Sequence, residues 1–278
     1  MKSSSSAMRL KSAIRAFAAE EGIPPQVALQ NFMFERFFAR LAQSPARDKF
    51  VLKGGVLVSQ YLGISRRTTM DVDLTLRNAA LEAENLKRVL GAVFDIALDD
   101  GIVWSLKVIE PIRENDAYGG LRVKTTATFE SIVVPFTMDV STGDVITPGA
   151  ELFYVKSRFA PNEFYPLNAY NVETVLAEKV EAILSRGVFT TRPRDYYDVY
   201  MILKSVAVDR DLFKKALTAT AKHRGSSKVI GQAAQLIETF AHSDLLRKQW
   251  VKFRREFDFA QGIEFEAVCA ALLDLVTK

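Results

Sequence analysis

The sequence predicts an α+β protein, in which a mixed sheet with flanking helices is followed by a mostly helical C-terminal part. Two patterns indicate this. Residues 50–140 alternate apolar runs of strand length with helical segments. From Asn171 onward, apolar residues recur at helical spacing, with breaks near 187–193 and at Gly225. We therefore expect two domains, residues 1–160 with the sheet and residues 161–278 with the helices.

The composition is that of an ordinary globular protein. With 278 residues, 49% of them hydrophobic, the chain can build one large or two modest cores. No run approaches the roughly 20 apolar residues of a membrane span, and the start of the chain lacks the apolar core of a secretory signal. A single cysteine, Cys269, excludes an internal disulfide and a cysteine metal cluster. We expect a cytoplasmic protein without a membrane partner.

The first elements are helices followed by a strand, a glycine turn and another helix. Residues 8–43 form the first helical stretch, and the apolar run 50–52 precedes Lys53, Gly54 and Gly55. Glycines let a backbone approach a ligand closely, and the N–H groups that open the following helix bind anionic oxygens. Lys53, Gly54 and Gly55 are thus candidate phosphate-binding residues. An ordinary glycine turn is the competing interpretation.

The next predicted strand covers residues 70–76 and carries two aspartates. Side chains alternate along a strand, so Asp71 and Asp73 share one face, whereas Met70 and Val72 belong to the packed apolar face. Two neighbouring carboxylates repel each other when both are ionised, and a divalent cation reverses that penalty. Magnesium prefers carboxylate and phosphate oxygens. Asp71 and Asp73 are therefore candidate Mg²⁺ ligands that need a nucleotide to complete the site.

Residues close to this pair are candidates for supporting roles. Arg67 carries a guanidinium that matches phosphate geometry, although a solvent-facing arginine is equally common. Thr69 lies on the strand face of Asp71, where it is expected to bind a phosphate or brace a metal ligand. Asp139 ends a predicted strand over 132–140 and is a candidate ligand or general base. A solvated aspartate beside a turn is the alternative.

The C-terminal half places a lysine in an apolar helical stripe. At about 100° per residue, Lys179 falls on the face of Val175 and Leu176, where a charge needs a partner. In the next predicted helix, Asp195 lies among apolar residues and Asp198 flanks them. We expect Lys179 to contact a triphosphate while Asp195 and Asp198 position it. A lysine that reaches water along its packed stem, and acidic residues that offset a helix dipole, are the alternatives.

Charge gives a weaker indication of the partner. Lys and Arg total 37 against 33 acidic residues, for a formal net charge of +4. Within a predicted helix over 245–257, Lys248, Lys252 and Arg255 share one face. This face is either a solvated basic surface or a surface that follows the phosphates of an RNA.

These motifs together resemble a known family. A Gly-Gly turn followed by Asp-x-Asp is similar to the nucleotidyltransferase superfamily related to DNA polymerase β. Residues 173–179, with Lys179, and 192–198, with Asp195 and Asp198, resemble the later motifs of the AbiEii-type family, the nucleotidyltransferase toxins of abortive-infection and toxin–antitoxin systems. The similarity covers roughly residues 50 to 200.

The resemblance implies a nucleotidyltransferase fold and an activity. It implies an Mg²⁺-dependent toxin that transfers a nucleotide from an NTP to an RNA acceptor, expected to be the tRNA 3′ end, under the control of a cognate antitoxin protein. Two other acceptors stay open, a small molecule such as an antibiotic and a hydroxyl of a protein. A nucleotide-binding regulator without catalysis is a third alternative, which the intact Asp71 and Asp73 disfavour.

Overall fold

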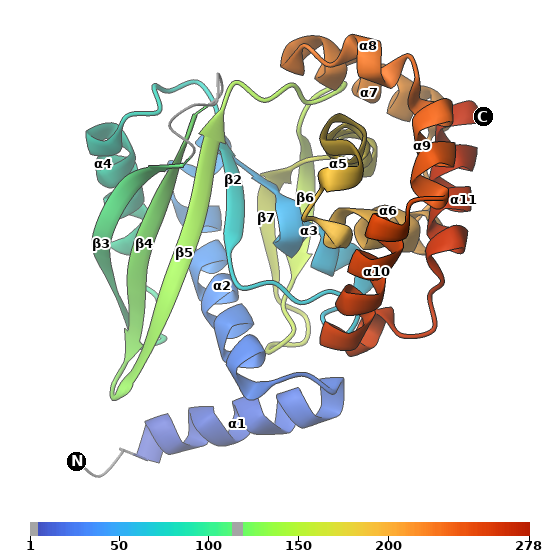
Figure 1. Cartoon of the computed structure of the whole chain (residues 1–278). Helices are drawn as coiled ribbons and strands as arrows, with labels where there is room; N and C mark the ends of the chain where they lie inside the picture. The colour runs from blue at the N-terminus through green and yellow to red at the C-terminus, as the bar shows by residue number, and fades with distance from the viewer. Residues whose placement is uncertain (1–4, 113–118) are drawn as a thin grey trace. The chain divides into compact units, whose positions relative to one another are not determined.

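The computed structural model describes residues 5–112 and 119–278 and divides into two compact units (Figure 1). The first comprises Met1–Asp144 and Glu151–Ala169, and the second Val145–Ala150 and Tyr170–Lys278. This division differs from the expected boundary after residue 160. The strand Phe164–Ala169 pairs into the sheet of the first unit. The carbonyl oxygen of Thr147 accepts a hydrogen bond of 2.8 Å from Asn171 Nδ2, which attaches the short segment to the helical unit.

A seven-stranded mixed sheet, counted over the described residues, organises the first unit in the order β3-β4-β5-β2-β1-β7-β6. β2 runs parallel to β5 and β1 parallel to β7, whereas the other neighbours are antiparallel. The α+β class and the mixed sheet are thereby confirmed. The strands are β1 (Phe50–Lys53), β2 (Val72–Leu76), β3 (Ile102–Ile112), β4 (Gly120–Phe129), β5 (Ile132–Thr142), β6 (Glu151–Lys156) and β7 (Phe164–Ala169).

The helices of the first unit flank this sheet. One helical stretch over 8–43 was expected, but the chain breaks at Gly22, whose φ is +64°. A proline at the start of the second helix strengthens the break, because proline is tolerated only in a first turn. Within the described residues no helix has the length and apolar character needed to cross a bilayer. The helical elements are α1 (Ser5–Glu21), α2 (Pro25–Gln43), η1 (Arg47–Lys49), α3 (Gly54–Leu62) and α4 (Ala83–Phe94).

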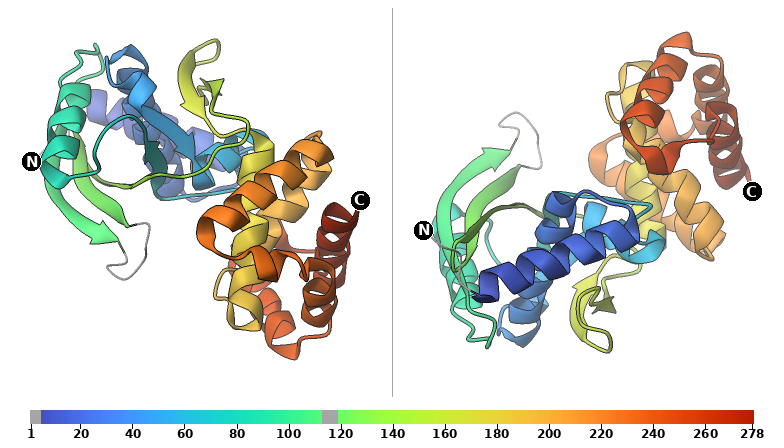
Figure 2. Two further views of the ribbon diagram at one scale, coloured as in Figure 1. Left: turned by 90° about the horizontal axis from the view of Figure 1, so that it is seen from above. Right: turned by 90° about the horizontal axis from the view of Figure 1, so that it is seen from below.

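The core of this unit lies between α2, α4 and one face of the sheet. The Phe136 ring of β5 contacts Phe34 and Phe37 of α2, with ring centroids 5.3 and 5.4 Å apart. Phe94 of α4 stacks on Trp104 at 5.4 Å. Along β5 the alternate residues from Ile132 to Val140 are buried, so the residues between them occupy the opposite face. α1 packs against α2 through a small apolar cluster (Figure 2).

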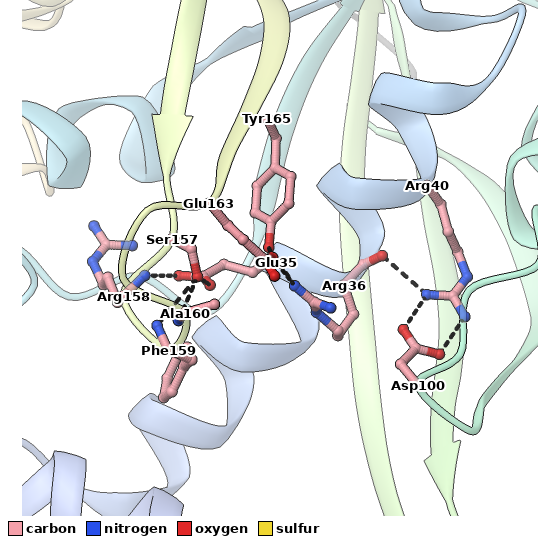
Figure 3. A network of polar contacts seen from close by, with 10 residues as sticks. All are labelled: Glu35, Arg36, Arg40, Asp100, Ser157, Arg158, Phe159, Ala160, Glu163 and Tyr165. Atoms are coloured by element: carbon pink, nitrogen blue, oxygen red, sulfur yellow. Dashed lines mark hydrogen bonds and ion pairs between the residues drawn. The ribbon is translucent and has the colours of Figure 1, made fainter.

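A buried polar network holds the loop between β6 and β7 to α2 (Figure 3). Glu35 of α2 accepts hydrogen bonds from Ser157 Oγ at 2.6 Å and from the Arg158 backbone N–H at 2.8 Å. Burial raises the pKa of the Glu35 carboxyl above its ordinary value, although these hydrogen bonds oppose the shift. Arg158 Nη2 also donates to the Ser59 carbonyl oxygen of α3 at 2.9 Å. The network therefore anchors α3, the helix that follows the glycine turn.

The second unit is helical, as the spacing of its apolar residues predicts. Asn171 caps α5 by accepting a hydrogen bond from the Thr174 N–H at 2.8 Å. The expected breaks are present, because η2 begins at Gly187 and Gly225 ends α7 with a φ of +69°. The helical elements are α5 (Val172–Arg186), η2 (Gly187–Phe189), α6 (Pro193–Ser205), α7 (Arg210–Arg224), α8 (Ser227–Ile230), α9 (Ala233–Ala241), α10 (Asp244–Glu256), η3 (Asp258–Ala260) and α11 (Phe265–Thr277).

Candidate active site

The turn between β1 and α3 lies directly against an aspartate of β2. Gly54 opens α3 with a φ of +64°, and a Cβ atom there would lie 1.9 Å from Asp73 Oδ2. The next N–H group, of Gly55, donates to the same oxygen at 3.3 Å. Only glycine therefore permits this backbone conformation and this approach together. The turn brings the N-terminus of a helix, which favours negative charge, to the Asp73 carboxylate.

The second glycine allows the segment before β2 to pack against the same turn. A Cβ atom on Gly55 would lie 2.7 Å from Thr69 Oγ1 and 3.2 Å from Arg67 Nη2. Thr69 Oγ1 donates to Asp71 Oδ1 at 2.8 Å and so orients this carboxylate, while its expected roles toward a metal ligand or a phosphate stay predictions. Arg67 is buried and donates to the Thr68 carbonyl oxygen. Its contact with a phosphate stays a prediction.

Asp71 comes directly before β2 and Asp73 lies within it, and their carboxylates influence each other. The strand begins at Val72, two residues later than expected, and Met70 is 45% exposed, so its expected place in the packed face is wrong. Burial raises the pKa of Asp73 to about 6, with a further contribution from Asp71. The positive charge of Lys53 opposes this shift. The expected repulsion between the paired carboxylates is therefore part of the structure.

A row of charged side chains crosses five strands on the sheet face that carries Asp73. Lys53 of β1 is the Cα partner of Asp73, and Asp73 is the partner of Asp139 of β5. Asp139 in turn is opposite Arg122 of β4, which is opposite Glu110 of β3. Side chains at paired positions share a face. The register thus brings Asp139 beside Asp73, and Asp139 contributes to the raised pKa of Asp73.

Arg122 binds Asp139 through both of its oxygens. Arg122 Nε lies 2.8 Å from Asp139 Oδ1, and Arg122 Nη2 lies 2.7 Å from Oδ2. The pKa of Arg122 is raised by this hydrogen bonding and by the charges of Asp139 and Asp71. Sequence reasoning missed Arg122, because one arginine on a strand gives no signal until the pairing of β4 with β5 is known.

Lys53 is held by a carboxylate that sequence reasoning also missed. Lys53 Nζ lies 2.8 Å from Asp144 Oδ2 and 2.7 Å from Ser141 Oγ. Thr75 Oγ1 donates to the same Asp144 oxygen at 2.6 Å. Burial raises the pKa of Asp144, but the charge of Lys53 and these hydrogen bonds outweigh burial and lower it on balance. The position of the Lys53 ammonium is therefore fixed, and its contact with a nucleotide stays a prediction.

The donor atoms at this end of β2 fit a magnesium ion that shares its coordination with a ligand. The described part of the chain contains no group of three or more His, Cys, Asp or Glu side chains arranged for a metal ion. Asp71 and Asp73 provide two hard carboxylates, and magnesium in proteins is commonly held by one or two carboxylates plus substrate phosphates and water. The pair therefore suits an ion that binds together with a nucleotide.

A second polar cluster joins α5 to α6 in the helical unit. Lys179 Nζ lies 3.0 Å from Asp195 Oδ1 and 2.7 Å from Asp198 Oδ2, and the Lys179 side chain is only 12% exposed. Arg192 Nε adds a contact of 3.0 Å to Asp195 Oδ2. The expected partner of the buried lysine is confirmed. The roles of Lys179, Asp195 and Asp198 toward a nucleotide stay predictions.

The basic residues of α10 divide into two groups. Arg247 and Arg254 form ion pairs with Glu266 and Glu264, at 3.1 and 2.5 Å. The other group is exposed to solvent, and within the described residues it has no hydrogen bond or ion pair. Its members are Lys248, Lys252 and Arg255.

Solved structures with a similar fold were found. JHP933 from Helicobacter pylori gives a TM-score of 0.53 at 16% sequence identity, and the alignment covers 90% of each chain. A second Helicobacter pylori protein, provisionally described as a nucleotidyltransferase, gives 0.48 at 17% identity, covering 91% of this chain and 94% of that one. At such low identity, the likeness to JHP933 concerns the fold alone.

The family comparison is more specific. None of the curated proteins matches the sequence. The family model described as "Nucleotidyl transferase AbiEii toxin, Type IV TA system" matches residues 36–271, a span that includes the glycine turn, the aspartates of β2 and the Lys179 cluster. The chain therefore belongs to the AbiEii family of nucleotidyltransferase toxins.

Proposed function

We propose that this nucleotidyltransferase uses Mg²⁺ to transfer NMP from an NTP to a hydroxyl of an RNA acceptor, expected to be the tRNA 3′ end. One observation carries the proposal. The Asp73 carboxylate lies against the N-terminus of α3 with Asp71 close enough to raise its pKa. Two carboxylates beside a helix N-terminus suit a cation together with an anionic ligand.

Each residue has a defined task in this proposal. Asp71 and Asp73 hold the cation, which when bound neutralises charge on the triphosphate and polarises the α-phosphorus. We assign the N–H groups of the Gly54–Gly55 turn to oxygens of the triphosphate, for which the Gly55 N–H would exchange its 3.3 Å hydrogen bond to Asp73 Oδ2. Thr69 holds the orientation of Asp71 through its 2.8 Å hydrogen bond.

The acceptor hydroxyl needs a group that takes its proton as it attacks the α-phosphorus. A P–O bond to the acceptor then forms, and the bond to the departing pyrophosphate breaks. We assign the proton to Asp139, the carboxylate next to Asp73 in the sheet. Arg122 engages both oxygens of Asp139 and makes the carboxylate a weaker base, so release of one oxygen would favour the transfer.

The remaining assignments concern the triphosphate and the acceptor. We assign Lys179 to a phosphate contact, supported by ion pairs with Asp195 and Asp198 that fix its ammonium. RNA as the acceptor is supported by the exposed cations of α10, since cations without protein partners are available for phosphates. Membership in a type IV toxin–antitoxin family supports a cognate antitoxin partner and a cytoplasmic location, where the modified RNA would block translation.

The test is to incubate the protein and Mg²⁺ with each labelled NTP in turn, together with bulk RNA, bulk protein or small molecules. We expect label on RNA with the wild type and none with Asp71→Asn, which keeps the size of the side chain but loses its charge. Asp99→Asn, at an exposed position away from β2, is the matched control and is expected to remain active. Label confined to protein or to a small molecule would replace the RNA proposal with one of those alternatives.

A further inference from the structure

The third carboxylate of the site is already neutralised by the protein itself. Arg122 engages both oxygens of Asp139, at 2.8 and 2.7 Å. A carboxylate held by a guanidinium in this way has one lone pair of each oxygen directed at the arginine, and its negative charge is neutralised. Asp139 is therefore a weak ligand for a cation at Asp71 and Asp73 as long as both hydrogen bonds to Arg122 are intact.

We propose that Arg122 is a positioning residue that keeps Asp139 out of the metal-binding set until a nucleotide arrives. This inference rests on the proposed function, because it concerns the same metal site. In the free protein the cation is held by Asp71 and Asp73 alone. Arg122 weakens the binding of the cation in two ways. It occupies Asp139, and it places a positive charge close enough to Asp71 to interact with that carboxylate.

The position of Arg122 allows it to change partners. Its side chain is 40% exposed, so it can leave Asp139 without opening the core. A nucleotide phosphate presents oxygens that match the same fork of donors. When Arg122 exchanges Asp139 for a phosphate, it therefore keeps two charge-assisted hydrogen bonds, and Asp139 is freed. Glu110, the neighbour of Arg122 on the other side, is already paired with Lys124 at 2.5 Å.

The consequence is that cation and nucleotide bind cooperatively. Without nucleotide, the cation competes with Arg122 for the charge of Asp139. With nucleotide, Arg122 follows the phosphates and Asp139 becomes available, so the affinity for the cation rises. Coupling of this kind is reciprocal, so the cation also raises the affinity for nucleotide. Removal of Arg122 should therefore strengthen metal binding in the free protein, even though it adds no carboxylate.

The experiment measures Mn²⁺ binding to the full-length metal-free protein by electron paramagnetic resonance. Without nucleotide, we expect Arg122→Gln to bind Mn²⁺ at least about fivefold more tightly than the wild type, because it releases the Asp139 carboxylate and removes a nearby positive charge. Arg122→Lys keeps the positive charge but loses the paired donors of the guanidinium, and its affinity for Mn²⁺ is expected to lie between those of the wild type and Arg122→Gln. With an unreactive NTP analogue, the affinity of the wild type for Mn²⁺ should approach that of Arg122→Gln.

Two variants separate release of Asp139 from a general charge effect. Lys124→Gln removes a positive charge from the same strand and face, and is expected to stay within about twofold of the wild type. Arg122→Gln combined with Asp139→Asn should lose the gain in affinity. Circular dichroism checks the fold of each variant.

The result that would overturn the inference is Mn²⁺ binding by Arg122→Gln that is no tighter than that of the wild type without nucleotide. A double variant as tight as Arg122→Gln would also overturn it. Asp71→Asn distinguishes the two proposals. If it loses Mn²⁺ while Arg122→Gln changes nothing, only this inference fails. If it binds Mn²⁺ normally, the metal site of the proposed function fails as well.

Discussion

Gly54 fixes the distance between the backbone of α3 and the Asp73 carboxylate. A methyl group at Gly54 would lie 1.9 Å from Asp73 Oδ2, so the Gly54→Ala variant must displace either the turn or the carboxylate. We expect this variant to lose at least about 100-fold in transfer activity, since misplacement by about 1 Å costs that much at a reacting centre. Steady-state kinetics with labelled NTP measures the loss.

Gly22 provides the matched control for this prediction. It has the same φ of +64°, but a Cβ atom there would meet nothing within 4 Å. Both alanine variants should lose about 1 kcal/mol of unfolding free energy from backbone strain. Only Gly54→Ala should lose activity, and equal activity in the two variants would contradict the role of the close contact.

Asp73 gives the site a pH dependence whose sign follows from its raised pKa. Burial, and then the charge of Asp71, raise this pKa from 3.8 to about 6 in the folded protein. The folded state therefore binds the proton more tightly than the unfolded state. The contribution of Asp73 to stability is fully present below pH 4 and is lost as the pH rises through 6.

We accordingly expect Asp73→Asn, which does not ionise, to gain stability relative to the metal-free wild type as the pH rises from 4 to 7.5. The gain should be on the order of 1–2 kcal/mol. Urea unfolding of both proteins at the two pH values measures this gain. At each pH the unfolding free energy of the wild type is subtracted from that of the variant, so that the contributions of other titrating groups cancel. A difference that does not change with pH would mean that the pKa of Asp73 is not raised.

At the scale of elements, α5 and α6 are joined by Lys179 and its two aspartates. Asp198 is fully buried, so removal of the lysine leaves a charge without its main compensation. We expect Lys179→Met to lose about 3 kcal/mol of unfolding free energy, as is typical when one partner of a buried ion pair is removed. Chemical denaturation measures this loss.

A combined variant separates this structural role from the proposed phosphate contact. Lys179→Met with Asp195→Asn and Asp198→Asn carries no uncompensated aspartate, and we expect it to regain a large part of the stability. It should nevertheless stay inactive, because the ammonium assigned to the phosphate is absent. Transfer activity restored together with stability would show that Lys179 acts only through the fold.

Local patterns were sufficient to predict most of the elements that carry the site. Alternation identified the strands with the aspartates, and the glycine pair identified the turn before α3. The partners Arg122 and Asp144 could not be predicted. Arg122 meets Asp139 through the register of β4 and β5, and Asp144 meets Lys53 because the turn after β5 folds back toward β1; contacts between distant residues set both. The break at Gly22 has a local signal, a glycine followed by two prolines, which apolar spacing alone does not detect.

Over the whole molecule, the distribution of charge matters more than its total. The formal net charge of +4 is small for 278 residues and gives little general attraction to RNA. Several basic residues around the aspartates and along α10 are engaged by acidic partners, namely Arg122, Lys53, Arg247 and Arg254. The exposed cations of α10 are thus the surface on which the expected RNA contact depends.

This surface predicts a dependence on salt that a matched variant can test. Replacement of Lys248, Lys252 and Arg255 by glutamine should raise the KM for RNA and leave the KM for NTP unchanged. The slope of log affinity against log salt concentration should fall by about 2, since each lost phosphate contact contributes roughly 0.7 for a single strand. The control replaces Lys11, Arg15 and Lys87, which are also exposed and carry the same total charge. If both triple variants weaken RNA binding equally, net charge rather than α10 governs the interaction, and the acceptor binds elsewhere.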